Sequence, residues 1–406
     1  MIADTAGTAL TNVSERRVAM LPGAIGFFFS FRLVIVLLSV RVFQADAQAG
    51  VMVSVGLNLL LFVLVAFHSF GPRQTSIRSA FRVPCFRWVL IFLAFSACSL
   101  FWTVALSRSA ALAFWCAMAA DVAMVVLLLR TGPEERMASA LMKGYVVGAC
   151  LIAMLAWLLP SQSDLRLGDE ELLGPNQIGY ACAFAVFFAQ YLIRRGATEW
   201  KIPAALLAIT LLRSLSKTTI VAFVLAQLFL LVRDSSISRK SKILFVVATC
   251  LVIAIFWNLL GAYYEVYSNA GNQAETLTGR LGIWAFILDK AIEQPWMGHG
   301  FHSVWKVIPP FEDFEARHAH NELLQQFYAY GVVGVIMLAG LYGSFYRQIR
   351  MLRVGPLRTL LVGLLLFVLV RGLADTEAFD LSLPLWTITL IGLTVARTHH
   401  SGEVLA

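Results

Sequence analysis

The 406 residues of this chain are too apolar for a soluble domain, since 59% are hydrophobic and 14% are charged, whereas soluble domains carry about 25% charged residues. The lipid bilayer must be the solvent for most of the chain, and only helices or closed barrels span a bilayer. The apolar runs are continuous rather than alternating, which excludes a barrel. The net charge of +8 is mostly loop charge, so nucleic acid is not an expected partner.

Runs of about 20 apolar residues indicate transmembrane helices, and the chain holds about twelve of them. We therefore expect an all-α integral membrane protein in contact with membrane lipids, forming a single domain over residues 1–406. In chain order the predicted cores are 20–40, 50–67, 88–106, 110–129, 138–159, 177–192, 202–212, 220–232, 243–260, 323–345, 360–370 and 381–395.

Lysine and arginine in the loops predict the orientation of the chain. With the N-terminus inside, the cytoplasmic side carries 20 of them and the opposite side 10, while Arg32 and Lys143 lie inside helices. Cytoplasmic loops of membrane proteins are enriched in these residues. Both termini are therefore expected in the cytoplasm, and the one large loop, residues 261–321, on the outer side.

This loop should contain an amphipathic helix, which would lie flat on the membrane surface, cover a cavity, or simply pack on the bundle. Thr276 or Thr278 could cap its start, and Pro295 lies beyond its end. The apolar residues at helical spacing are Leu281, Trp284, Ile287, Leu288, Ala291 and Ile292.

Arg213 and Lys217 flank a short turn between the runs 202–212 and 220–232. Eleven helical residues rise about 17 Å, against a hydrocarbon core of about 30 Å. The two charges are therefore expected below the outer surface, where charge usually lines a polar cavity. If the turn is helical, both residues share one face; alternatively, both side chains reach up to the interface.

Arg280 stands at the start of the predicted amphipathic helix. A cation beside a helix N-terminus is unfavourable unless an anion is close. Backbone N–H groups together with a guanidinium bind phosphate well. Arg280 is thus a candidate diphosphate ligand, and the alternative is a solvated loop arginine.

Residues 317–322 read Arg-His-Ala-His-Asn-Glu, just before an apolar run. His318 and His320 lack a third ligand in sequence reach, so no metal site is predicted. A histidine can act as a general base near neutral pH, and Asn321 or Glu322 could orient it. Alternatively, these residues only cap a helix. Combined with the basic residues, they suit an anionic lipid-linked substrate whose diphosphate is bound while a hydroxyl is activated.

Three segments in this order resemble the O-antigen ligase and Wzy-type polymerase superfamily. They are LSKTT at 215–219, TGRLGIWAFILDKAIEQPWMGHGF at 278–301, and HAHNELLQQFYAYGVVG at 318–334. The resemblance covers roughly residues 176–340 by motif. It implies a GT-C-like glycosyltransferase of the bacterial inner membrane that transfers a glycan from undecaprenyl diphosphate to an acceptor hydroxyl. Transfer would occur at the periplasmic face, with inversion and without a metal or other cofactor.

The resemblance also implies roles for individual residues. His320, which directly precedes Asn321, would be the catalytic base. The diphosphate would be bound by Lys217 and Arg280, with Arg213 as a further candidate. Arg317, His318 and Asn321, the neighbours of His320 in sequence, are expected to support the site.

The acceptor is less sharply indicated. Lys217 stands where many ligases carry arginine, and with Trp305 it looks more like the ExoQ-type polymerases. We therefore slightly favour a polymerase that joins lipid-linked repeat units over a ligase that uses lipid A–core. A polysaccharide chain-length regulator is a candidate partner of such a polymerase. A transporter for lipid-linked oligosaccharides is the alternative of another class, although no repeated halves with matching broken helices are visible.

Overall fold

The computed structural model is helical, and the residues that it describes contain no β-strand. These residues are 2–70, 77–160, 166–169, 172–234, 238–255, 261–262, 264–265, 277–305, 307–308, 318–376 and 381–403. Arg317 lies outside them, as does much of the loop 261–321.

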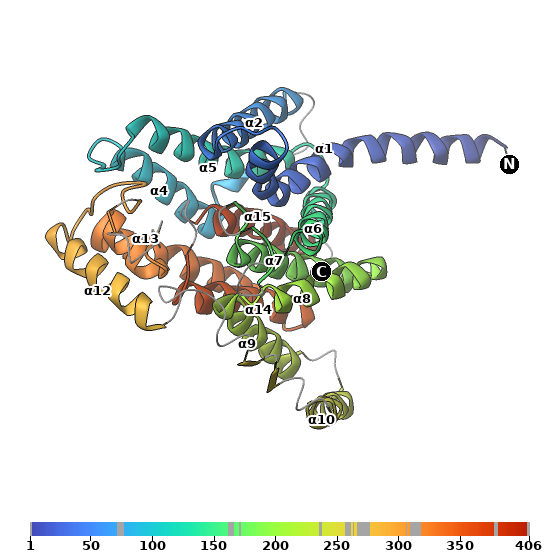
Figure 1. Cartoon of the computed structure of the whole chain (residues 1–406). Coiled ribbons are helices and arrows are strands. Elements are labelled where there is room, and N and C mark those ends of the chain that lie inside the picture. The colour runs from blue at the N-terminus through green and yellow to red at the C-terminus, as the bar shows by residue number, and fades with distance from the viewer. Residues whose placement is uncertain are drawn as a thin grey trace.

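The helices follow one another in the order shown in Figure 1, and each of the predicted apolar cores overlaps one of them. They are α1 (Ile2–Arg41), α2 (Ala47–His68), α3 (Ile77–Ala80), α4 (Pro84–Ser99), α5 (Arg108–Leu128), α6 (Glu134–Leu158), α7 (Pro175–Arg194), the 3-10 helix η1 (Thr198–Trp200), α8 (Lys201–Arg213), α9 (Lys217–Arg233), α10 (Arg239–Ile255), α12 (Leu277–Glu293), α13 (Glu322–Met351), α14 (Pro356–Gly372) and α15 (Ser382–Glu403).

Six helices in the described part of the chain are long and apolar enough to cross a membrane: residues Ala19–Arg41 of α1, and α2, α5, α6, α7 and α13. The chain is therefore treated as a multi-pass membrane protein. The number of about twelve full spans is not confirmed, because several predicted runs form shorter helices. Helix α8 has 13 residues and α14 has 17, which gives about 20 Å and 25 Å of rise.

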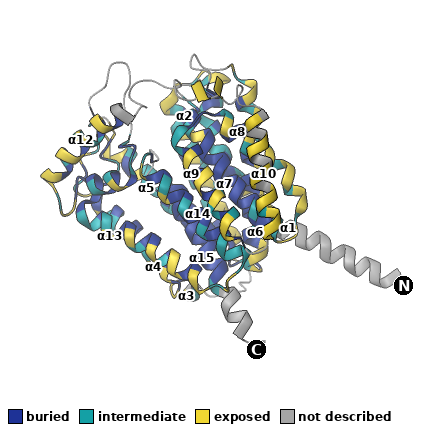
Figure 2. Ribbon diagram, turned by 90° about the horizontal axis from the view of Figure 1, so that it is seen from below, coloured by how far each residue is buried: buried dark blue, intermediate teal, exposed yellow. Residues whose placement is uncertain are grey.

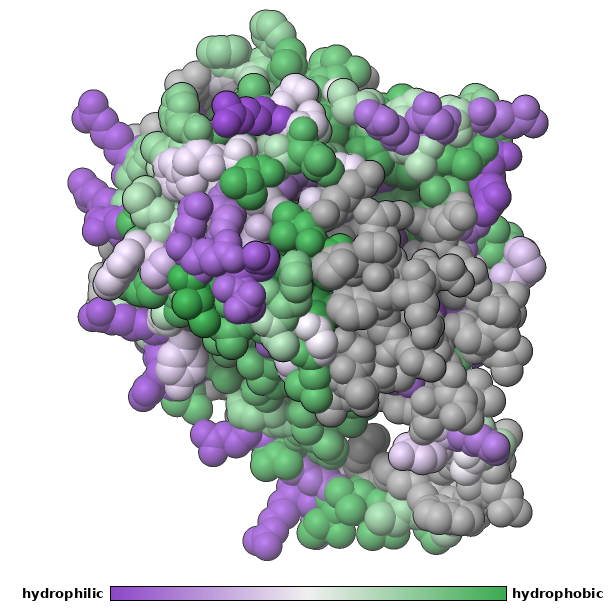
Figure 3. Space-filling model, turned by 60° about the vertical axis from the view of Figure 1, so that its left-hand side comes forward, coloured by the Kyte–Doolittle hydropathy of each residue, from purple (hydrophilic) through white to green (hydrophobic). Residues whose placement is uncertain are grey.

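Helix α7 forms the centre of the bundle, and α2 lies at its outside. In α7, 78% of the most apolar window is buried, against 17% in α2; the contrast is visible in Figure 2. Figure 3 shows apolar side chains exposed on the outer surface as well. Such exposure is expected of helices that face lipid tails rather than water.

Helix α12 confirms the predicted amphipathic helix and ends before Pro295. Ile283, Ile287 and Ala291 are fully buried in a hydrophobic cluster that includes Tyr328 of α13. Of the six apolar residues predicted to form one face of this helix, only Ile287 and Ala291 are among the fully buried ones. A second apolar row stays exposed: Leu281, Leu288 and Ile292.

Helix α13 is broken at Gly331, where φ is +62° and ψ is −155°. Essentially only glycine adopts this conformation. The break deprives the next two backbone N–H groups of their helical acceptors. Val332 donates instead to the carbonyl of Pro295 at 2.7 Å, and Val333 to that of Trp296 at 3.4 Å.

The carbonyls freed by the break are satisfied by the same loop. Tyr328 O accepts from the N–H of His299 at 3.0 Å, and Ala329 O from that of Gly300 at 2.8 Å. Gly300 has φ of +90°, and a Cβ there would lie 2.5 Å from Thr103 Cα. The Gly-x-Gly of residues 298–300 therefore lets this loop reach the broken helix, which satisfies buried backbone groups that lipid could not.

Candidate functional site

Helix ends that are distant in sequence meet at one end of the bundle. The end of α14 contacts the start of α9, because Arg371 Nε donates to Thr219 Oγ1 at 3.4 Å. The loop before α13 contacts the loop after α14 through His320 and Asp375. The predicted clusters around residues 217, 280 and 320 thus share one region, as expected from their position in alternate loops.

His320 and Asp375 form the centre of the site. His320 Nδ1 lies 3.3 Å from Asp375 Oδ1, and both side chains are almost fully buried. Burial opposes ionisation of Asp375, but Arg371 and His320 outweigh it and hold the pKa of this carboxyl well below its ordinary value. An ionised carboxylate only accepts hydrogen bonds. The Nδ1 of His320 therefore carries the proton, and Nε2 is the basic nitrogen.

Arg371 fixes the position of this carboxylate. Its Nη2 donates to Asp375 Oδ2 at 3.0 Å, and its guanidinium carbon lies 3.6 Å from the ring centroid of Tyr180. Arg371 is 5% exposed. A guanidinium stacked on an aromatic ring and bound to a carboxylate is rigidly held. Asp375 is therefore held by Arg371 at Oδ2 and by His320 at Oδ1.

Arg280 lies in the first turn of α12 and is 6% exposed. Its Nη1 donates to the carbonyl of Ala374, next to Asp375. Within the described part of the chain, its Nε has no hydrogen-bond partner and no carboxylate pairs with it. A buried guanidinium with unused donors fits an anionic ligand such as a diphosphate.

The turn between Arg213 and Lys217 is not helical, so the condition under which they share one helix face is not met. Leu215 has φ of +56°, and Ser216 is the extended N-cap of α9. Both charged side chains are half-buried. Thr219, in the first turn of α9, makes one contact between this region and the cluster, because it accepts from Arg371 Nε.

His318 and Asn321, two further predicted site residues, lie beside His320 and make different contacts. The ring centroid of His318 lies 4.1 Å from that of His320, and burial together with nearby positive charge holds the pKa of His318 well below its ordinary value. Asn321 caps α13 by accepting from Leu324 N at 3.0 Å. It donates to Leu373 O at 2.8 Å. Asn321 therefore ties the two loops together, while the carboxylate that orients the imidazole is that of Asp375.

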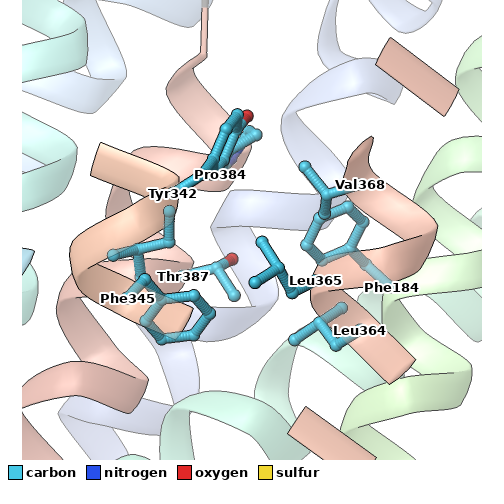
Figure 4. Close-up of a pocket in the computed structure, with 9 residues that line it drawn as sticks. Phe184, Tyr342, Phe345, Leu364, Leu365, Val368, Pro384 and Thr387 are labelled. Atoms are coloured by element: carbon cyan, nitrogen blue, oxygen red, sulfur yellow. The ribbon is translucent and has the colours of Figure 1, made fainter. Parts of the chain in front are cut away.

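Glu322 bonds within α13, where its Oε1 accepts from the hydroxyl of Tyr342 at 2.9 Å. Tyr342 also lines an apolar pocket between α7, α13, α14 and α15 (Figure 4). The pocket presents no charged group, so it is unsuited to a diphosphate.

His318, His320 and Asp375 offer three donor atoms within 4.8 Å of one another, a set that sequence spacing does not reveal. Asp375, however, already binds Arg371 and His320. A second guanidinium, that of Arg280, is held at Ala374. Positive charge beside the set disfavours a cation, so the arrangement fits a general base with its orienting carboxylate better than a metal centre.

Sequence reasoning missed Arg371 and Asp375 as site residues: Arg371 was counted only among the basic residues of the outer side, and Asp375 was given no role. One signal was available. They stand four residues apart at the end of the run 360–370, and opposite charges at this spacing beside a membrane helix indicate a buried pair.

The helices define a multi-pass membrane protein, and a buried histidine, carboxylate and guanidinium lie together at one end of its bundle. Residues 202–339 match the model of a family described as O-antigen ligase. Over 178 residues the chain is 27% identical to an O-antigen ligase of Pseudomonas aeruginosa, a match that covers 44% of this chain and 41% of that relative. The chain thus matches less than half the length of this relative. The resemblance to the O-antigen ligase and Wzy-type polymerase superfamily is confirmed by both comparisons.

Proposed function

We propose that the chain is a glycosyltransferase that moves a glycan from undecaprenyl diphosphate to an acceptor hydroxyl at the outer face of the bacterial inner membrane. The observation that carries this proposal is the ordered base beside an anion site. His320 is oriented by Asp375, and Arg280, held at the neighbouring Ala374, keeps donors available for a diphosphate.

In the proposed step, the acceptor oxygen attacks the anomeric carbon of the donor sugar. The bond from that carbon to the diphosphate oxygen breaks, and the electron pair leaves with the diphosphate. The hydroxyl proton passes to Nε2 of His320, whose positive charge Asp375 stabilises. Arg280, with Lys217 and Arg213 as further candidates, stabilises charge on the leaving group. Attack opposite the leaving group inverts the anomeric centre.

Two acceptors are candidates. The named relative is an O-antigen ligase, which makes lipid A–core the first acceptor to test. A second lipid-linked glycan is the other candidate, because Lys217 and Trp305 favour a polymerase. A chain-length regulator would be a partner only of the polymerase.

Purified protein in lipid nanodiscs, supplied with lipid-diphosphate glycan and each acceptor in turn, tests the proposal. Wild type should form a glycosidic product with one acceptor, and Arg280→Ala should lose most of the activity while remaining folded. Charge-assisted contacts contribute about 1.5–3 kcal/mol each, or about 10- to 150-fold in rate. Arg280→Lys should rescue only in part, because lysine lacks the planar fork.

Arg41→Ala is the matched control. Arg41 pairs with Asp169 at 2.6 Å but is 56% exposed, so its loss should leave transfer unchanged. Near-normal transfer by Arg280→Ala would refute the diphosphate role. In proteoliposomes, movement of the donor between leaflets without a glycosidic product would favour the transporter instead.

A further inference from the structure

Helix α12 carries buried, exposed apolar and charged side chains on three separate faces. Residues along an α-helix are rotated by about 100° from one to the next. Measured from the buried Ile287, the exposed apolar side chains lie about 100° to 160° around the helix. They are Leu281, Ala285, Leu288 and Ile292. The charged side chains of Asp289, Lys290 and Glu293 lie about 200° to 300° around it.

The exposed surface of α12 is thus divided into an apolar side and a charged side. On the charged side, Lys290 Nζ and Glu293 Oε1 lie 2.6 Å apart, and both side chains remain exposed, as expected in water. The apolar side is exposed without a charged residue among its members. A helix that separates apolar from charged exposure in this way is typical of a membrane interface, with one side in the lipid and the other in water.

The C-terminal end of α12 is held at the surface of the hydrocarbon core. The carbonyls of Pro295 and Trp296, just beyond this end, accept from the N–H groups of Val332 and Val333. Residues 332–351, the part of α13 after its break, rise about 30 Å, which is the thickness of a hydrocarbon core. The first residues of that segment, and the end of α12 with them, therefore lie at one membrane surface.

The N-terminal end of α12 is held near the same surface. Arg280 donates to the carbonyl of Ala374, two residues after the end of α14. Helix α14 follows α13 after a short loop, residues 352–355, and returns about 25 Å through the bundle. Its C-terminal end is therefore on the same side as residue 332. With both ends at this side, α12 lies along the membrane surface rather than across the bilayer.

The position of α12 in the bundle and the side chains beyond its end fit the same interface. Helix α12 lies at the edge of the bundle, beside α13 (Figures 1 and 2). Trp296 is 71% exposed, and Met297 is exposed beside it. Tryptophan is enriched at membrane–water boundaries, because its ring is apolar and its N–H group is polar.

We infer that the exposed apolar face of α12 binds the lipid surface of the membrane. Leu281, Leu288 and Ile292 lie at the boundary between head groups and acyl chains, while Asp289 and Glu293 face water. The charged side carries two carboxylates and one lysine, so the contact is apolar in origin and needs no anionic lipid. The inference concerns membrane contact alone and is independent of the proposed function.

Quenching of a fluorescent label by brominated lipid tests the inference. In a background with the six native cysteines replaced, Leu288→Cys and its neighbour Asp289→Cys each receive a bimane label in phosphatidylcholine nanodiscs. Bromine on the acyl chains should reduce the fluorescence of the label at position 288 about twofold or more, because that label lies at the acyl boundary. The label at position 289 is the matched control and should be unaffected. Iodide in the water should quench it and spare position 288.

Both positions are exposed, so the labels leave the core of the bundle intact. Replacing part of the phosphatidylcholine by phosphatidylglycerol should not change bromine quenching at position 288, and quenching that requires this anionic lipid would contradict the inference. Iodide quenching at position 288 would place the apolar face in water. Absence of quenching there by either reagent would show that protein covers it. Equal bromine quenching at positions 288 and 289 would show that α12 is not oriented by lipid, and each of these three results would overturn the inference.

Discussion

At the residue scale, His320 and His318 lie in ring contact but differ in their partners. Only His320 bonds to the Asp375 carboxylate, while His318 Nδ1 accepts from the backbone N–H of His320 at 3.4 Å. We predict that His320→Ala abolishes transfer, since a general base contributes about 10²–10⁴-fold, and that donor binding is retained. His318→Ala should be milder. Turnover and donor binding of the purified variants decide this, and near-normal turnover of His320→Ala would remove the base assignment.

Asp375→Asn tests the orienting carboxylate. Asparagine keeps the shape but offers either an amide N–H or a neutral carbonyl to His320, so the preferred tautomer and the stabilisation of the imidazolium are lost. We expect kcat to fall by about 10²-fold or more, with donor binding preserved. Asp169→Asn, which removes the partner of Arg41 near the surface, should have wild-type kcat. A wild-type rate for Asp375→Asn would show that the carboxylate is dispensable.

The histidines of the loops also predict how stability depends on pH. Burial lowers the pKa of His302 from 6.5 to about 4, and burial and positive neighbours lower that of His318 well below 6.5. Below pH 6.5 the unfolded chain therefore binds more protons than the folded chain. The free energy of unfolding should therefore decrease as the pH is lowered below 6.5, by up to about 1.4 kcal/mol per pH unit for each histidine.

Melting temperatures measured between pH 7.5 and pH 5 test this expectation. Wild type should become less stable across that range, and replacing His318 and His302 by asparagine should flatten the dependence. The carboxyl of Asp375 does not interfere, because a lowered pKa takes its stabilisation away only in stronger acid, below about pH 4. An equally steep loss in the double variant would contradict the assignment.

The site residues found from sequence were those whose chemistry shows in a local pattern. Arg280 stands at a helix start and His320 beside a helix cap, and both positions were predicted. The contacts of Asp375 with His320, and of Arg371 with Tyr180, join residues far apart in the chain. Neither helical periodicity nor spacing encodes such pairings, because they depend on which helix ends the bundle brings together.

At the element scale, each predicted apolar run overlaps a helix of the structure. Such runs could be predicted because a long apolar segment in a membrane can satisfy its backbone hydrogen bonds by itself only as a helix. The break of α13 was not predicted. Its apolar run continues through Gly331, and the groups that satisfy the break come from residues 295–300. The non-helical turn before α9 was not predicted either, because leucine at position 215 is not a residue type that favours turns.

Gly331→Ala tests the break. The conformation of Gly331 is essentially closed to alanine, and a Cβ there would overlap the backbone of Pro295 and Trp296. We expect destabilisation of at least about 1–3 kcal/mol from backbone strain alone. Gly343→Ala is the control, because nothing lies within 4 Å of its added Cβ and alanine is the better helix former. Thermal unfolding measures both, and equal stability would show that α13 tolerates a regular helix.

At the scale of the whole molecule, the charge bias predicts the topology. In a background with the six native cysteines replaced, a cysteine at position 268, which lies outside the described residues, should react with an impermeant reagent applied from outside. A cysteine at Ser401 should not. The reverse pattern would invert the orientation and with it the proposed outer-face reaction, since positively charged loops stay on the cytoplasmic side.

The order of synthesis bears on how the broken helix α13 assembles. The loop that completes α13, residues 295–300, emerges before α13 itself, so every partner of the break is available when that helix enters the membrane. The ion pair between Arg32 of α1 and Asp121 of α5 likewise joins two helices that precede α13. Arg371 and Asp375 follow only at the end of α14. The helices from α1 to α13 can therefore assemble while the carboxylate that orients His320 is still missing, and catalytic competence should follow their assembly.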